Sequence, residues 1–182
     1  FVDNIADGTS SSGGETARGG AISTWEHCDL DIDFCTFYGN SCDTEDVSGT
    51  GNVIDTAFGE GGGAISTSAD HNPCTVNVDS SILWGNGPFE ISYNGSGGGG
   101  SETLIVTYSD IEGPSPPTPY VGTGNINADP LFTNAGGDAA NDYTLATGSP
   151  CVDVGKDGTL PRYDLAGNNR GETDRDMGAY ER

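Results

Sequence analysis

The residues of this chain that could act as catalytic bases are few. A lyase needs a base that takes a proton near neutral pH, beside a cation that neutralises the carboxylate of the substrate. The candidates for that base are one lysine, two histidines and one arginine: Lys156, His27, His71 and Arg18. A hydrolase needs two carboxylates opposed at a defined separation, whereas alternate aspartates such as Asp29, Asp31 and Asp33 form the solvated side of a strand. The sequence therefore predicts no enzyme, and a polysaccharide-degrading lyase or hydrolase is the alternative.

Aspartates at equivalent positions of a repeat are the candidates for a metal site. Asp33 and Asp79 are expected to stack about 5 Å apart on neighbouring strands, where like charges destabilise each other. Calcium takes carboxylate and carbonyl oxygens and would reverse the sign of that interaction. The sequence predicts calcium there or around a second group of aspartates, Asp153, Asp157 and Asp164. The cysteine spacings do not match a zinc site.

Five cysteines are present, an odd number. Cys28 and Cys74 are equivalent in the repeat, so neighbouring strands would place their Cα atoms about 4.8 Å apart, within the range of a disulfide. We predict this disulfide; two stacked buried thiols are the alternative. Cys35 and Cys42 flank a turn that they could close, and Cys151 is expected to be an unpaired core residue.

Two aromatic residues are candidates for ligand binding. Tyr38 and Trp84 are equivalent, and each follows an inward-facing residue, so we expect their rings to stack on the outer surface. Exposed stacked rings could bind a sugar, while rings that only shield the hydrogen bonds of the strands are the alternative.

These residues are positioned by a repeat. The segment Gly19–Asn40 recurs as Gly62–Asn86, with an offset of 46 residues from the cysteine onward, and a shorter copy follows at Thr103–Gly113. Half a copy opens the chain, because Phe1–Asn4 matches Phe37–Asn40. Such self-similarity is typical of stacked repeats. We therefore expect the chain to begin inside a repeat and to be a fragment of a longer one.

Each repeat contains short alternating runs of β-branched and apolar residues, which indicate strands, and no helix is expected. The alternation turns one set of side chains inward, in register along the stack: Leu30, Ile32, Val76, Val78, Leu104 and Val106. The prediction is an all-β fold, a right-handed parallel β-helix (solenoid) with Gly-rich loops. Asn4, Asn40 and Asn86 fall at one turn position and could form a ladder of side-chain amides.

The chain is expected to be a single domain over residues 1–182, with repeat rungs in 1–113 and closing rungs and a cap in 114–182. Four prolines between residues 114 and 119 end the regular pairing, and strand character resumes at Asn125–Phe132 and Tyr143–Leu145. A turn near residues 164–170 is expected to be held by a contact between Asp164 and Arg170. The segment would cover the open end of the stack.

The composition excludes two classes of partner. The formal net charge is −22, so nucleic acid and anionic membrane surfaces are repelled. No apolar stretch approaches the length of a membrane span. An acidic, lysine-poor surface fits a salt-rich or calcium-rich exterior.

Two family resemblances follow from these motifs. The Gly-Gly-Ala-Ile and Phe-x-x-Asn alternation resembles the repeats of polymorphic outer membrane proteins and related bacterial surface β-helices. The C-terminal half resembles the closing module of secreted parallel β-helix proteins of the choice-of-anchor type, through Ser81–Asn86, Tyr108–Gly113, Gly124–Phe132, Asp142–Leu145, Gly148–Asp153, Asp164–Arg170 and Asp176–Glu181. These resemblances imply a fold and an extracellular or cell-surface location, and no settled activity.

Together these observations predict an extracellular structural or adhesive protein of the bacterial surface. The first complete rung has no full partner beneath it in this chain, and such an edge is a template for pairing. We expect it to be covered by upstream rungs of a longer chain or by self-association into a filament. Glycans are further candidate partners.

Overall fold

The computed structural model of the chain describes residues 1–7, 19–25, 27–43, 54–55, 62–68, 72–94, 102–113, 122–137, 139–158 and 160–182. This part is all-β apart from one short 3-10 helix, a turn that the sequence pattern did not predict. Its elements are β1 (Ile5–Asp7), β2 (Ile22–Trp25), β3 (Asp29–Asp33), β4 (Thr36–Tyr38), β5 (Ser41–Asp43), β6 (Ile54–Asp55), β7 (Gly62–Ser68), β8 (Cys74–Asp79), β9 (Ile82–Trp84), β10 (Phe89–Asn94), β11 (Glu102–Thr107), β12 (Asp110–Ile111) and η1 (Ala140–Tyr143).

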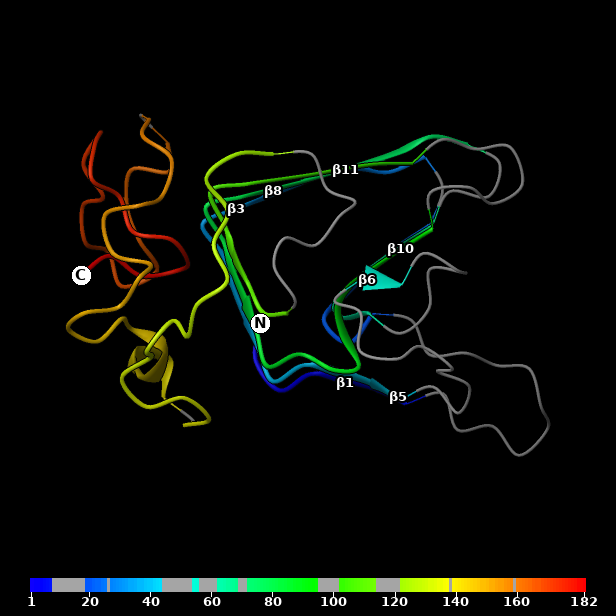
Figure 1. Ribbon diagram of the computed structural model, residues 1–182, viewed down its shortest axis with the longest axis horizontal. Coiled ribbons are helices and arrows are strands. Elements are labelled where there is room, and N and C mark those ends of the chain that lie inside the picture. The colour runs from blue at the N-terminus through cyan, green and yellow to red at the C-terminus, as the bar shows by residue number, and fades with distance from the viewer. Residues whose placement is uncertain are drawn as a thin grey trace.

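The prediction of a right-handed parallel β-helix is wrong for this structure. The strands are two to seven residues long and lie in four small parallel sheets rather than in one continuous solenoid: β1-β5, β2-β7-β10-β6, β11-β8-β3 and β12-β9-β4. In Figure 1 the strands β3, β8 and β11 of one sheet overlie one another.

The corners explain why the sheets are separate. Phe34, Ser80 and Tyr108 occupy equivalent positions and have φ of 52°, 50° and 49°. Left-handed backbone cannot continue a strand, so each of these residues ends a strand of one sheet just before a strand of the next begins. None of the three is glycine, which is the residue that usually marks such a corner.

The register predicted from the repeat is confirmed. Leu30 pairs with Val76 and Val76 with Leu104, while Ile32 pairs with Val78 and Val78 with Val106. All of these side chains are buried except Leu30, which is half-buried on the edge strand β3. They form one apolar core with Phe37, Ile65, Leu83 and Ile91.

The predicted asparagine ladder is also present. Asn4 Nδ2 donates to Asn40 Oδ1 at 2.8 Å, and Asn40 Nδ2 donates to Asn86 Oδ1 at 2.7 Å. A second ladder runs along the other corner, where the N–H of Cys35 donates to Ser81 Oγ and the N–H of Ser81 donates to Ser109 Oγ. Both ladders join one repeat to the next.

The C-terminal part, residues 122–182, has two roles. Ile126 pairs with Asp110 at the edge of β12, so this stretch adds to the open end of that sheet. The following residues lie along the flank of sheet β12-β9-β4, in yellow to red in Figure 1. The strand character expected at Asn125–Phe132 and Tyr143–Leu145 is reduced to isolated bridges.

A second apolar cluster joins this part to the sheets. Its buried members are Ile82 of β9 and Leu145, Cys151 and Met177 of the C-terminal part. The backbone N–H of Ala179 also donates to Thr36 Oγ1 at 3.0 Å, in β4. The C-terminal part is therefore packed against strands from successive repeats.

Candidate functional site

The aspartates predicted to bind calcium are placed in different surroundings. Asp33 and Asp79 pair in register, as expected. The cation beside them is a lysine, because Lys156 Nζ donates to Asp79 Oδ2 at 2.9 Å. Asp79 also accepts from Thr107 Oγ1 and Ser80 Oγ. Burial, with the charge of Asp79 next, raises the pKa of Asp33.

The other predicted ligands are not gathered around one point. Asp164 is buried and accepts hydrogen bonds from Asn168 and from the backbone N–H of Glu181, while Asp153 and Asp157 are exposed. Among the residues that the structure describes, no group of three or more His, Cys, Asp or Glu side chains is arranged to hold a metal ion. Calcium stays a prediction from the sequence.

The structure shows which of the cysteines form a disulfide. The disulfide expected between Cys28 and Cys74 is present, with their Cα atoms 4.5 Å apart. Cys35 and Cys42, which could have closed a turn, form no disulfide. Cys151 is a buried thiol whose Sγ donates to Asp110 Oδ2 at 3.1 Å.

The two predicted sugar-binding rings lie under the C-terminal part. Tyr38 and Trp84 pair in register on β4 and β9, but both are half-buried. The ring of Tyr38 packs against Phe132 and Tyr143, with centroids 5.7 and 5.4 Å away, and Trp84 packs against the cluster around Met177. This placement gives both rings a packing role.

The candidate bases do not converge within the described residues. Lys156 is held by Asp79, and His27 is exposed in a turn with φ of 51°. Asp31 accepts from Asn77 Nδ2 at 2.8 Å, across neighbouring strands. Arg18 and His71 lie outside the residues that the structure describes.

Sequence reasoning missed three carboxyls whose pKa is raised to about 6 or above. Burial raises the pKa of Glu90 to about 8, and both of its oxygens accept hydrogen bonds from Asn86. Burial also raises the pKa of Asp110 to about 6 and that of Glu181 to about 7. None of these three residues has an acidic counterpart in another repeat, so the sequence repeat did not mark them. They do not line the cavities described next.

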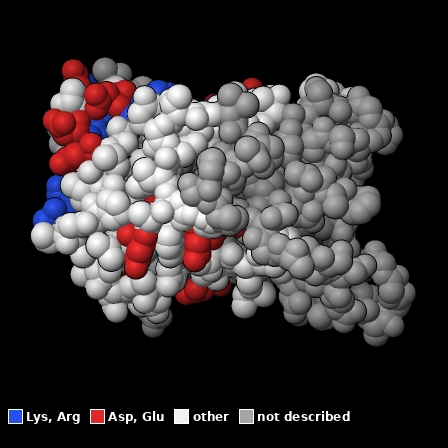
Figure 2. All heavy atoms as spheres, viewed as in Figure 1, with Lys and Arg blue, Asp and Glu red and all other residues white. Residues whose placement is uncertain are grey.

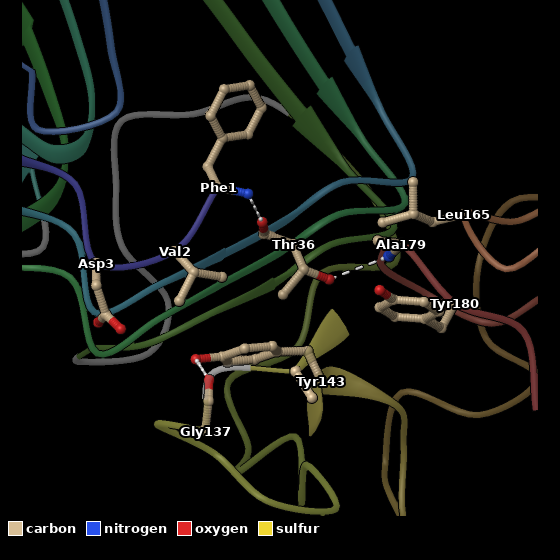
Figure 3. A pocket seen from close by; sticks show the side chains of 10 residues that line it. Phe1, Val2, Asp3, Thr36, Gly137, Tyr143, Leu165, Ala179 and Tyr180 are labelled. Carbon is tan, nitrogen blue, oxygen red and sulfur yellow. Dashed lines mark hydrogen bonds between the residues drawn. The ribbon is translucent and has the colours of Figure 1, made fainter. Parts of the chain in front are cut away.

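A groove runs between the edge of β4 and the C-terminal part. One cavity in it, of about 470 Å³, is lined by Phe1 and Thr36 on one side and by Tyr143, Leu165 and Tyr180 on the other. Figure 3 shows the side chains that line this cavity, among them Thr36, whose Oγ1 accepts a hydrogen bond from the backbone N–H of Ala179. Burial raises the pKa of both tyrosines, so their hydroxyls stay protonated.

Two further cavities continue this groove along a hairpin, residues 162–170. One of about 410 Å³ shares Thr36 and Leu165 with the first and is also lined by Tyr163. The other, of about 320 Å³, is polar and is lined by Arg162, Tyr163, Asn169, Gly171 and Glu172. Tyr163 therefore lines both cavities, and 58% of the residue is exposed.

Buried charges hold this hairpin, although not through the contact predicted from the sequence. Arg170 donates to Glu181 at 3.0 Å and to the carbonyl of Gly178 at 2.7 Å, rather than to Asp164. Asp164 bridges Asn168 to the backbone of Glu181. Burial disfavours its ionisation, yet these hydrogen bonds outweigh burial and lower its pKa.

The guanidinium groups of Arg170 and Arg175 flank one ring. Their carbon atoms lie 4.6 and 4.3 Å from the centroid of Phe34, within the range of a cation–π contact. Arg175 also donates to the carbonyls of Leu160 and Pro161. The hairpin is thus fixed to the corner that follows β3.

Comparisons of the chain with protein-family models, with curated proteins and with solved structures found no match. The two family resemblances therefore remain expectations from the sequence. Across the described ranges, no helix has the length and hydropathy needed to cross a membrane.

Proposed function

We propose that this chain is an extracellular structural or adhesive protein of the bacterial surface. The observation that supports it best is that polar and covalent links join equivalent residues of successive repeats. These are the asparagine ladder, the disulfide between Cys28 and Cys74 and the pair Asp31–Asn77. Such links stiffen a scaffold, and a disulfide is kept in oxidising surroundings outside the cytosol.

Three carboxyls with strongly raised pKa values are consistent with a structural or adhesive protein. In the described part, Glu90, Asp110 and Glu181 have raised pKa values, but each is occupied by hydrogen bonds to its own neighbours. A general acid or base must reach a substrate proton, and these three carboxyls line none of the three cavities. Asp33, whose pKa is also raised, does line the cavity of about 410 Å³, beside Asp164 and Arg170. Self-association is a further part of the proposal, since the outer edge of β3 has no partner strand among the described residues.

The test compares retention with turnover. The purified chain is passed over immobilised neutral and acidic polysaccharides and is also incubated with the same polymers in solution. We expect retention on at least one polymer, without new reducing ends and without unsaturated uronate products. Depolymerisation that increases with protein concentration and is lost in Asp110→Asn would contradict the proposal and favour the enzyme alternative.

A light-scattering measurement tests the structural part. We expect the mass to increase with protein concentration, because an edge strand with free N–H and C=O groups favours pairing. A mass of one chain at every concentration would remove self-association from the proposal.

A further inference from the structure

The hairpin of residues 162–170 carries an exposed aromatic residue that lines two cavities of different character. Tyr163 lines the cavity of about 410 Å³, where its neighbours Pro161 and Leu165 are apolar. It also lines the cavity of about 320 Å³, where its neighbours Arg162, Asn169 and Glu172 are polar. Both volumes lie within the range of small-molecule sites.

The ring is presented by a fixed backbone. Tyr163 bridges Asn169 across the hairpin, and the N–H of Arg170 donates to the carbonyl of Arg162 at 3.0 Å. The next residue on each side, Asp164 and Arg170, is buried and hydrogen-bonded into the C-terminal part. A backbone that is already ordered loses little conformational entropy when a ligand binds.

The polar side chains beside the ring are available to a ligand. Arg162, Asn169 and Glu172 are exposed. Within the described ranges, the side chains of Arg162 and Glu172 make no hydrogen bond, whereas Asn169 Oδ1 accepts from Gly171 and leaves its amide protons free. Together they offer N–H donors and carboxylate acceptors on one side of an aromatic face.

A sugar ring matches this combination. Its C–H face is apolar and stacks on an aromatic ring, while its hydroxyl groups both donate and accept hydrogen bonds. The net charge of −22 repels a polyanionic glycan, and Figure 2 shows side chains of both signs at one end of the molecule. A neutral glycan avoids this repulsion.

We propose that Tyr163 is the centre of a binding site for a neutral oligosaccharide. One sugar ring stacks on Tyr163, its hydroxyls face Arg162, Asn169 and Glu172, and the chain of sugars continues past Leu165 into the groove. This inference rests on the proposed adhesive function and names its ligand class.

The test is calorimetric titration of the chain with cellohexaose, maltohexaose, mannohexaose, xylohexaose and hexagalacturonate. We expect at least one neutral hexasaccharide to bind in preference to hexagalacturonate. Tyr163→Ala should weaken that binding about tenfold, whereas Tyr163→Phe, which keeps the ring, should stay within about threefold of the parent. Leu131→Ala is the matched control, because Leu131 is 41% exposed and lines none of the three cavities.

Three binding results would each overturn the inference: no binding by the neutral sugars, equal binding by Tyr163→Ala, or tighter binding of hexagalacturonate. A change in oligomeric mass in Tyr163→Ala would instead assign this surface to a second copy of the chain and also overturn it. If Tyr163→Ala fails to fold, Arg162→Ala and Glu172→Gln serve as the test, and both should weaken binding about threefold or more. Equal binding by these two variants would then overturn it.

The two proposals fail separately. Turnover of a polysaccharide would contradict the structural or adhesive function even if Tyr163 binds a sugar. Retention on a polymer that Tyr163→Ala leaves unchanged would keep the adhesive function and remove this site.

Discussion

Glu90 takes the acceptor position that another asparagine would have in the ladder. Asn40 donates to Asn86, and Asn86 donates from its backbone N–H and from Nδ2 to the two oxygens of Glu90, at 3.0 and 2.5 Å. Only 3% of Glu90 is exposed. Burial penalises the carboxylate, so Glu90 is mostly protonated at neutral pH.

This carboxyl predicts a dependence of stability on pH. Folding raises the pKa of Glu90 from 4.5 to about 8, so the folded state binds the proton more tightly. Its contribution is therefore greatest below pH 4.5 and is lost as the pH rises towards 8. Asp110 and Glu181 act in the same direction. We expect the free energy of unfolding, measured with urea, to fall between pH 5 and pH 8.

The substitution Glu90→Gln isolates the contribution of one residue to this dependence of stability on pH. The amide cannot titrate, so the fall between pH 5 and pH 8 should shrink by about 2 to 4 kcal/mol. The amide accepts at one atom only, so the variant is expected to be less stable at pH 5. We therefore compare how the free energy of unfolding changes with pH in the two chains, rather than its absolute value, which removes this effect. An unchanged slope would show that Glu90 is ionised in the folded chain.

At the scale of elements, the ladder and the disulfide connect the short strands. Asn40 is fully buried; it accepts from Asn4 and donates to Asn86 and to the carbonyl of Phe1. Because the strands of β12-β9-β4 are only two or three residues long, few backbone hydrogen bonds hold each one. Side-chain links are thus a large share of what joins the repeats.

Asn40→Ala should lower the free energy of unfolding by about 2 to 3 kcal/mol, since it leaves buried donors and acceptors without partners. Asn127→Ala is the matched control: Asn127 is exposed, and its change should stay within about 0.5 kcal/mol. Urea titrations followed by circular dichroism give both values. If the two substitutions lower the free energy of unfolding equally, the asparagine ladder does not contribute to stability.

The disulfide closes a loop of 46 residues between Cys28 and Cys74. Replacing both cysteines with alanine should lower the free energy of unfolding by about 2 to 4 kcal/mol, mainly by freeing the unfolded chain. A reducing agent should lower the unfolding midpoint of the parent chain and leave that of the double variant unchanged. If the reducing agent leaves the unfolding midpoint of the parent chain unchanged, Cys28 and Cys74 do not form a disulfide.

The sequence repeat predicted the contacts between equivalent residues of successive repeats. It could not predict features formed by residues that have no counterpart in another repeat. Register, the asparagine ladder and the disulfide follow from equivalent residues such as Cys28 and Cys74, which must meet when repeats stack. The separate sheets could not be foreseen, because Phe34 and Tyr108 take left-handed φ without being glycine. Glu90 lies four residues beyond Asn86, where no other repeat has a counterpart, so nothing marked it as the end of the ladder.

At the scale of the molecule, the C-terminal part connects strands that are distant in sequence. Tyr38 was expected on the surface, yet Phe132 and Tyr143 cover it. Single residues such as Met177 and Cys151 have no repeated partner, so the sequence could not show that they pack against Ile82. The groove and its hairpin exist only because this part lies along the flank.

Met177→Ala tests whether the two parts unfold together. Met177 is fully buried, so truncation should lower the free energy of unfolding by about 2 to 4 kcal/mol through lost contacts and a cavity. We expect backbone and aromatic circular dichroism to shift to the same new midpoint. Val154→Ala, at a residue 39% exposed, should shift neither signal. Two separate midpoints in Met177→Ala would mean that the C-terminal part unfolds independently.

The contact between Ala179 and Thr36 also bears on the order in which the chain folds. It joins residues 143 positions apart, whereas residues paired between strands are only about 26 to 46 positions apart. Contacts between distant residues form slowly, because the entropy of closing the intervening loop is lost first. During synthesis, at about 5 to 20 residues per second, the first repeats can pair several seconds before residue 179 exists. In that interval the apolar flank at Ile82 and Trp84 is exposed to water, and a nascent chain is then most open to aggregation or to capture by a chaperone.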